Sequence, residues 1–239
     1  MANWAGHLIR REAEVDSTNW QARLWAREGA PHGAAVIAGA QTAGRGRRGR
    51  AWSSAAGMGL WLSMVVKPKV PQAEYPMLAF AAALAAADAV RVAAGVDARI
   101  KWPNDLLFGG RKLAGILAEK EGGAAVIGIG VNVRQKKEDF PPELRESAVS
   151  LEMITGKPVS PDALERALFS ELERRIEGWN FMREYASRCD TIGKAVRVAE
   201  ADKEYAGVAE GLDALGALLV RDQQGALRRV LAGDVSVRM

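Results

Sequence analysis

Apolar and polar residues occur along the first half of the chain in blocks that predict helices and short buried strands. Helices are expected at 18–28 and 75–94, and strands at 34–39 and 58–66. Asp16 or Ser17 can cap the first helix, and Gly29 can end it. The second helix is rich in alanine, so it can lie close to a sheet and be buried on most sides.

The middle of the chain predicts a sheet followed by more helix. Strands are expected at 99–102, 105–108, 112–121 and 124–133. Glycine pairs at 109–110 and 122–123 join the last three of these strands, which predicts an antiparallel meander. A charged, proline-containing segment, 134–160, is expected to be irregular. Ser160 and Pro161 then open a helix to about residue 179, and a shorter helix follows to Cys189.

Short strands at close spacing fill the C-terminal part. They are expected at 195–198, 204–210, 217–221, 228–231 and 235–238. A β-barrel of about 45–50 residues is too small to bury much core by itself, so we expect it to pack on the main domain. The pattern therefore predicts an α+β protein with a main domain at 1–190 and a small β domain at 191–239.

Composition excludes several classes of protein. Of 239 residues, 49% are hydrophobic and 26% charged, as in a soluble globular protein. No apolar run reaches the length of a membrane span, and the N-terminus has no secretory signal. One cysteine, Cys189, excludes an internal disulfide, and neither His7 nor His32 lies in a metal-ligand motif. We expect a cytoplasmic protein with no metal site and no membrane partner.

The most informative segment runs from Gly44 to Arg50, where four arginines and three glycines follow one another. Glycine lets backbone N–H groups approach a ligand, and arginine offers a planar fork of donors to a carboxylate or phosphate. The formal net charge of the chain is +4, so these arginines equal the whole excess. This distribution predicts a focused anion site more than a broad basic surface.

Other interpretations of this loop are weaker or stay open. Gly44, Gly46 and Gly49 have the spacing of a dinucleotide fingerprint, but no helix-forming segment follows and positions 64–70 contain no acid. A P-loop is excluded because no Gly-Lys-Ser/Thr occurs. A solvated turn remains open. So does a nucleic-acid patch in which Trp52 would stack on a base.

Three further segments carry candidate chemistry. Lys101 leaves a strand just before a Trp-Pro break, so its ammonium group could reach an anion, although by itself this position is explained better as a surface lysine at a strand end. Gly115 lies inside a strand, which indicates close approach by a ligand or backbone, or a bulge. In the segment 16–19, a helix cap explains Ser17 but not three consecutive polar side chains.

Together and in this order, these segments resemble the biotin protein ligases. The resemblance rests on Ser17-Thr18-Asn19, the run from Gln41 to Arg50, Lys101-Trp102-Pro103-Asn104-Asp105, the run from Lys112 to Leu117, and Gly128-Ile129-Gly130-Val131-Asn132. It covers residues 10–135 strongly and the C-terminal part loosely. It implies a class II synthetase-like catalytic domain with a mixed, largely antiparallel sheet packed with helices, plus a small C-terminal SH3-like β-barrel. Some members carry an N-terminal helix-turn-helix domain. This chain begins almost at the catalytic part, so we expect no DNA partner.

The resemblance implies a two-step reaction. Biotin's carboxylate attacks the α-phosphate of Mg-ATP to give biotinyl-5′-AMP, and a lysine of a biotin carboxyl carrier protein then takes up the biotinyl group. Biotin, ATP and Mg²⁺ would enter as substrates, and no tightly bound prosthetic group is expected.

Roles for individual residues follow from the same resemblance. Arg47 and Lys101 are expected to be catalytic and to contact the carboxylate and then the adenylate phosphate. The residues expected to bind biotin are Ser17, Thr18, Asn19, Gln41, Arg45, Gly46, Arg47, Lys101 and Gly115. Those expected to bind the nucleotide are Arg48, Arg50, Trp52, Asn132 and Arg238. No residue is expected to hold a resident metal.

Two rival functions remain at this point. A lipoate or octanoate protein ligase of related fold would have a long apolar tunnel. A non-enzymatic nucleic-acid-binding module would bind oligonucleotides in a salt-dependent way. A homodimer is compatible with the sequence but not required by it.

Overall fold

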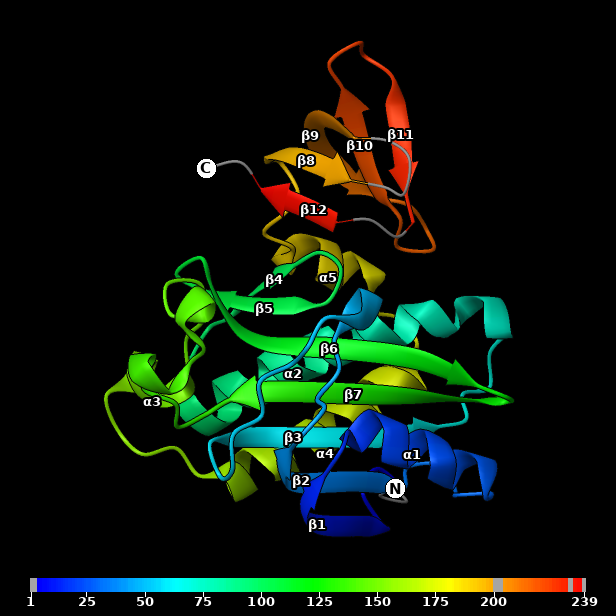
Figure 1. Cartoon of the computed structure of the whole chain (residues 1–239). Helices are drawn as coiled ribbons and strands as arrows, with labels where there is room; N and C mark the ends of the chain where they lie inside the picture. Colours follow the sequence, from blue (N-terminus) through cyan, green and yellow to red (C-terminus); the bar gives the residue numbers. More distant parts are fainter. Residues whose placement is uncertain (1–3, 200–203, 232–233, 238–239) are drawn as a thin grey trace.

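A computed structural model describes residues 4–199, 204–231 and 234–237, which form two β-sheets with helices packed on the larger one (Figure 1). The α-helices are α1 (Thr18–Arg27), α2 (Leu78–Ala94), α3 (Leu151–Thr155), α4 (Pro161–Gly178) and α5 (Met182–Arg188). The strands of the larger sheet are β1 (Ile9–Val15), β2 (Ala35–Gln41), β3 (Gly59–Val66), β4 (Arg99–Lys101), β5 (Asp105–Phe108), β6 (Arg111–Glu121) and β7 (Ala124–Asn132). Those of the smaller sheet are β8 (Ala195–Ala199), β9 (Glu204–Leu212), β10 (Leu218–Asp222), β11 (Leu227–Val230) and β12 (Asp234–Val237).

The larger sheet has seven strands in the order β1-β2-β3-β7-β6-β5-β4. Strands β5, β6 and β7 form the antiparallel meander that the glycine pairs predict. β1 runs parallel to β2, and the other neighbouring strands are antiparallel. The mixed, largely antiparallel sheet predicted from the sequence is therefore confirmed.

Helix α2 supplies the centre of the core. Every residue from Phe80 to Val90 is buried, because α2 lies between the sheet and α4 (Figure 1). By length and composition, the segment Gln72–Ala94 could cross a membrane, but most of its apolar stretch is buried inside the protein. α1 packs on the opposite face of the same sheet, against β3 and β7. The sheet thus has helices on both faces, with α1 on one face and α2 and α4 on the other.

Three expectations of secondary structure need correction. The hydrophobic pattern does not predict strand β1, since most of its seven residues are polar and exposed; it forms because β2 offers an unpaired edge. The predicted helix beginning at residue 75 instead starts as a 3₁₀ turn, Gln72–Met77, because Pro76 cannot donate to the helix ladder. The segment expected to be irregular contains α3, which Ser150 caps by accepting a hydrogen bond from the Met153 N–H.

The smaller sheet is antiparallel, in the order β11-β10-β9-β8-β12, and is the small C-terminal β structure that the strand spacing predicts. It is tied to the larger sheet through Trp102, just after β4. The Trp102 indole N–H donates to the Gly216 carbonyl oxygen at 2.9 Å, and its backbone N–H donates to Thr191 Oγ1 at 3.0 Å. The end of β4 is therefore held by the smaller sheet.

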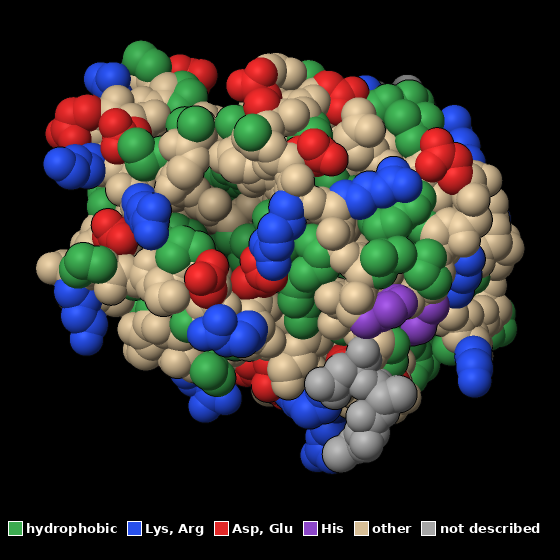
Figure 2. All heavy atoms as spheres, turned by 90° about the horizontal axis from the view of Figure 1, so that it is seen from below, with side chains coloured by type: hydrophobic (Ala, Val, Ile, Leu, Met, Phe, Trp, Pro, Cys, Tyr) green, Lys and Arg blue, Asp and Glu red, His purple; other side chains and the backbone are tan. Residues whose placement is uncertain are grey.

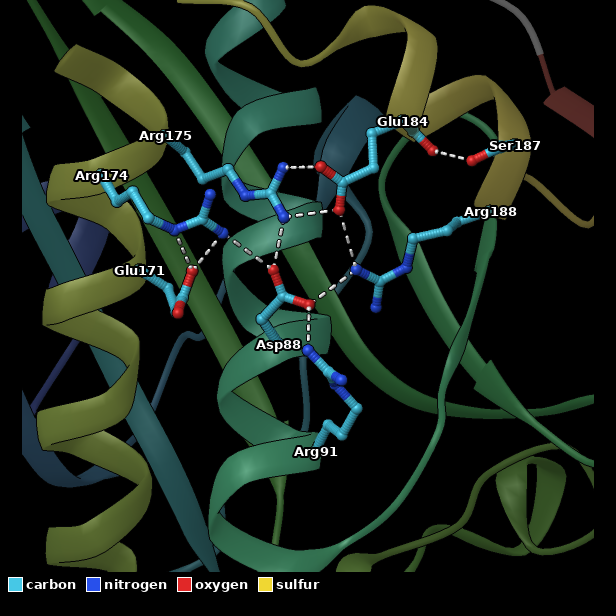
Figure 3. A network of polar contacts seen from close by, with 8 residues as sticks. All are labelled: Asp88, Arg91, Glu171, Arg174, Arg175, Glu184, Ser187 and Arg188. Carbon is cyan, nitrogen blue, oxygen red and sulfur yellow. Dashed lines mark hydrogen bonds and ion pairs between the residues drawn. The ribbon is translucent and has the colours of Figure 1, made fainter. Parts of the chain in front are cut away.

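A network of charged side chains joins α2, α4 and α5 on the helical side of the sheet (Figure 3). At its centre is the buried Asp88 carboxylate, which accepts from Arg175 Nη2 at 2.5 Å and from Arg188 Nη1 at 2.7 Å. Arg175 also pairs with Glu184. Burial tends to raise the pKa of Asp88, but the hydrogen bonds from Arg175 and Arg188 outweigh it, so the pKa lies below its usual value. The three helices are held together by charge as well as by apolar packing.

Candidate active site

A cavity of about 360 Å³ lies on the α1 side of the larger sheet. Its walls come from the start of α1, the glycine–arginine loop, the turn between β4 and β5, and the strands β6 and β7. Val235 of β12 also lines it, so the C-terminal sheet contributes to the wall. The cavity brings together residues that are more than 200 positions apart in the sequence.

One wall of the cavity is a network of uncharged polar side chains. Thr18 donates to Gln41 Oε1 from its backbone N–H at 2.7 Å and from its hydroxyl at 3.0 Å. Gln41 Nε2 donates to Ser54 Oγ at 2.7 Å. Ser63 Oγ lies 2.8 Å from Thr18 Oγ1 and 2.9 Å from Asn19 Oδ1. These side chains are pre-arranged to exchange hydrogen bonds with a small polar ring.

Glycines on β6 and β7 make room for the side chains that form the cavity. A Cβ on Gly128 would lie 2.1 Å from Asn19 Oδ1. A Cβ on Gly130 would lie 2.5 Å from Trp52 Nε1, and one on Gly115 would lie 2.9 Å from the Trp52 ring. Gly115 does mark a close approach, as predicted, and in this structure the neighbour is Trp52.

The glycine–arginine loop is held by its own backbone. Gly46 N–H donates to the Arg50 carbonyl at 2.7 Å, and Trp52 N–H donates to the Gly44 carbonyl at 2.9 Å. Gly49 has φ +73°, a conformation that glycine adopts without strain. From this loop Arg47 Nη1 reaches Asn104 Oδ1 at 3.2 Å. Arg47 is thereby brought to the segment that carries Lys101.

Lys101 is positioned by its neighbours on both sides. The carbonyl of Ile100 accepts from the Asp190 N–H at 2.7 Å, and that of Pro103 accepts from the Tyr185 hydroxyl at 2.8 Å. Burial raises the pKa of Tyr185 well above its ordinary value, so it stays a neutral donor. The Lys101 side chain lines the cavity, and within the described part of the chain no carboxylate pairs with it. An ammonium group held this way is suited to meet an anionic ligand.

Residues missed by the sequence reasoning also line or support the cavity. Lys112 Nζ pairs with Asp105 Oδ1 at 2.8 Å and lies 5.1 Å from the centre of the Trp52 ring. Both residues belong to the motifs quoted above, yet the motifs alone assign neither of them a role. Ser63, a lone hydroxyl within the apolar strand β3, is a signal that could have been noticed. Glu119, outside the cavity lining, accepts from Asn19 Nδ2 at 2.7 Å.

The structure brings most predicted site residues to this one cavity. Those that line it are Thr18, Asn19, Gln41, Arg45, Gly46, Arg47, Arg48, Arg50, Trp52, Lys101, Gly115 and Asn132. Ser17 is buried and is not part of the lining; its hydroxyl accepts from the Trp20 N–H at the start of α1. Arg238 lies outside the described residues.

Two lining residues also make contacts within the protein. The Arg45 guanidinium lies 5.3 Å from the centre of the Trp20 ring on α1. The Asn132 amide donates to the Lys112 and Val149 carbonyls at 3.4 and 3.2 Å and accepts from Gln135 Nε2 at 3.2 Å. Because these bonds use both of its N–H groups, Asn132 acts here as a brace for the wall.

Within residues 4–199, 204–231 and 234–237, no group of three or more His, Cys, Asp or Glu side chains is arranged to hold a metal ion. Acidic and basic side chains are mixed on the face of the molecule seen from below, with no continuous basic patch there (Figure 2). That face therefore offers no support for a nucleic-acid-binding module.

Comparisons with known proteins agree on one family. The model of the Biotin/lipoate A/B protein ligase family matches residues 13–135, and that of the Biotin protein ligase C terminal domain matches residues 191–238. The Bifunctional ligase/repressor BirA of Bacillus spizizenii is 34% identical over 248 residues, covering 97% of this chain and 74% of that protein. The Biotin--[acetyl-CoA-carboxylase] ligase of Mycobacterium tuberculosis is 37% identical over 234 residues, covering 93% and 86%.

Among solved structures, the biotin protein ligase from Aquifex aeolicus in complex with biotin and ATP superposes with a TM-score of 0.84. It is 28% identical in sequence, and the match covers 97% of this chain and 99% of that one. The likeness extends over both sheets, in agreement with the two family models. The chain therefore belongs to the biotin protein ligase family of enzymes.

Proposed function

We propose that this protein activates biotin with ATP to give biotinyl-5′-AMP and transfers the biotinyl group to a lysine of a biotin carboxyl carrier protein. The observation that carries the proposal is the convergence of Arg47 and Lys101 on a cavity whose other wall is uncharged and polar. The Mycobacterium tuberculosis relative is named as a biotin ligase, and the Aquifex aeolicus structure contains biotin and ATP, which supports the same substrates.

The polar wall suits the head group of biotin. A cyclic urea has one carbonyl acceptor and two ring N–H donors. Amide N–H groups of Gln41 and Asn19 can meet the carbonyl, and hydroxyl oxygens of Thr18 and Ser63 can meet ring N–H groups. A lipoyl ring offers no such donors or acceptors, so this wall gives no reason to favour a lipoate ligase.

The cations suit the activation step. A biotin carboxylate oxygen forms a bond to the α-phosphorus of ATP while the bond to the β-phosphate oxygen breaks, and pyrophosphate leaves. Two anions must approach each other, and charge grows on the phosphate oxygens. Lys101 and Arg47 would offset that charge in the transition state more than in the ground state, which is the condition for catalysis. The Mg²⁺ ion would enter with ATP as part of the substrate.

The remaining lining residues suggest where the nucleotide lies. Arg48 and Arg50 would face its phosphates, and the Trp52 ring offers a surface for the adenine. The Lys112 ammonium group lies beside the Trp52 ring and would add a positive charge near the nucleotide. In the second step, the amine of the carrier lysine would attack the acyl carbon of the mixed anhydride, forming an amide and releasing AMP.

The deciding experiment is exchange of labelled pyrophosphate into ATP in the presence and absence of biotin. Exchange that requires biotin, followed by transfer of labelled biotin to a purified biotin carboxyl carrier domain, is the expected result. Exchange with lipoate or octanoate in place of biotin would favour the rival ligase. No exchange with any of these acids, together with salt-dependent oligonucleotide binding, would favour a nucleic-acid-binding module.

A further inference from the structure

We propose that Glu119, which lies behind the cavity wall, sets the donor and acceptor pattern of the polar network and is a specificity-determining positioning residue. The inference rests on the proposed function, because it concerns how the same cavity selects a cyclic urea. Neither the sequence pattern nor the comparisons give Glu119 a role. It belongs to β6, near the far end of that strand from the glycine–arginine loop.

The network has two ends whose polarity is fixed. The Thr18 backbone N–H can only donate, so Gln41 must turn its carbonyl oxygen toward it, at 2.7 Å. The Glu119 carboxylate can only accept, so Asn19 must turn its NH₂ group toward it, at 2.7 Å. Asn19 turned the other way would place two oxygens against each other at that distance. Each amide therefore has one allowed orientation.

The fixed amides in turn orient the hydroxyl groups between them. Asn19 Oδ1 can only accept, so the Ser63 hydroxyl donates to it at 2.9 Å. The Thr18 hydroxyl donates to Gln41 Oε1 at 3.0 Å, and Ser63 Oγ lies 2.8 Å from Thr18 Oγ1. Both hydroxyl protons are thus used internally, and the two oxygens can offer only lone pairs to a ligand. Ring N–H groups of a ligand are matched, and ligand acceptors at those positions are rejected.

Burial raises the energetic cost of a mismatched hydrogen bond in this network. Thr18 and Asn19 are 4% and 3% exposed, and Ser63 is fully buried, so water cannot repair a wrong hydrogen bond. Glu119 is itself held by Arg23, whose Nη1 donates to Glu119 Oε1 at 3.2 Å. One carboxylate oxygen faces Arg23 and the other faces Asn19. Glu119 thus links the surface of α1 to the buried network.

The chain provides a matched control two residues along the same strand. Glu121 accepts from Arg23 Nε at 2.7 Å and from Arg27 Nε at 2.8 Å, whereas the Asn19 side-chain amide donates to Glu119. Glu119→Gln and Glu121→Gln remove the same charge from the same strand and disturb the same helix. Only Glu119→Gln lets Asn19 reverse, because the new amide can donate to Asn19 Oδ1.

The experiment measures biotin binding by calorimetry and the Michaelis constants for biotin and ATP with wild type and both variants. Glu119→Gln is expected to weaken biotin binding about tenfold, which corresponds to about 1.4 kcal/mol, with the KM for ATP unchanged. The ratio of the affinity for biotin to that for 2-iminobiotin, which replaces the urea carbonyl with an imine, should be smaller in the Glu119→Gln variant than in wild type. Glu121→Gln should leave both the affinity and the preference as in wild type.

Exchanging the amide and the carboxylate between positions 19 and 119 gives an independent check. Asn19→Asp alone places a carboxylate against Glu119 and should weaken biotin binding more than Glu119→Gln does. Adding Glu119→Gln to Asn19→Asp lets the new amide donate to the carboxylate introduced on α1, keeps an acceptor facing Ser63, and should recover part of the affinity. Equal effects of Glu119→Gln and Glu121→Gln, or no recovery in the double variant, would overturn the inference. Absence of biotin-dependent exchange in the wild type would instead overturn the proposed function.

Discussion

The charge network on the helical face of the larger sheet and Lys101 on its cavity face use charge in different ways. On the helical face, Arg175 and Arg188 each pair with Asp88 and with Glu184 (Figure 3). On the cavity face, Lys101 has no carboxylate partner among the described residues. Charges that are compensated within the protein hold helices together. A cation left uncompensated, next to a cavity, is held in place by backbone hydrogen bonds and remains able to compensate a ligand.

The largest expected effect is on catalysis and comes from removing the Lys101 ammonium group. Lys101→Ala should lower the rate of adenylate formation by about 10²–10³-fold, because the ammonium group acts on charge that develops in the transition state. The free energy of unfolding should change by less than about 0.5 kcal/mol, since no internal ion pair is lost. Pyrophosphate release and urea denaturation measure the two quantities. Lys120→Ala, at an exposed position of the same sheet, is the control. Near-normal pyrophosphate release from Lys101→Ala would remove this residue from the mechanism.

On the helical face, removing a charge is expected to lower stability and to leave substrate binding unchanged. Asp88→Asn should lower the free energy of unfolding by about 3–5 kcal/mol, because it leaves the buried Arg175 without its central partner. The Michaelis constants for biotin and ATP should not change in the fraction that remains folded. Glu171→Gln removes a partner of the exposed Arg174 and should cost about 0–1 kcal/mol. Equal losses in the two variants would mean that burial of the network does not matter.

A smaller effect concerns retention of the intermediate. Arg47→Gly removes a guanidinium group that we expect to hold the adenylate phosphate. Loss of one charge-assisted hydrogen bond, about 1.5–3 kcal/mol, should raise biotin labelling of non-carrier lysines by about tenfold or more. Labelling of serum albumin relative to the carrier domain measures this leak. Unchanged selectivity would contradict the retention role.

The smallest effect is a pH dependence of stability. Hydrogen bonds from Arg27 and Arg23 lower the pKa of Glu121 to about 2, and hydrogen bonds from Arg175 lower the pKa of Glu184. Since these folded-state pKa values lie below the unfolded ones, the unfolded chain binds more protons as the pH falls. The stabilisation is therefore complete above about pH 4.5 and is lost toward pH 2.

Urea denaturation between about pH 5 and pH 3 measures this loss. The midpoint should fall over that range, and Glu121→Gln should reduce the slope by removing about 1 kcal/mol or less. A variant with the same slope as the wild type would show that Glu121 is not one of the responsible groups.

The sequence predicts the elements that bury apolar residues better than those defined by pairing alone. The alanine-rich run predicts the buried helix α2, and the glycine pairs predict the turns of the meander. Strand β1 has no such signal, because its residues are polar and it is stabilised by hydrogen bonds to β2. Backbone pairing at a sheet edge leaves no hydrophobic pattern in the sequence.

The candidate site shows the same division. Short segments with unusual composition, such as the glycine–arginine loop, identify most of the residues that line the cavity. Ser63 and Glu119 belong to ordinary strand sequence, and only their neighbours across the sheet reveal a role. Asn132 lies in a predicted motif, and only the structure shows that its amide also donates to the Lys112 and Val149 carbonyls.

By itself, then, the sequence determined the family resemblance, the order of most elements and the segments that carry charge to a ligand, since these depend on residue types close together in the chain. The tertiary structure decided which cations keep a carboxylate partner and which way the buried amides point. Those properties depend on side chains that are far apart in sequence, such as Asn19 and Glu119, and that meet only when the sheet forms.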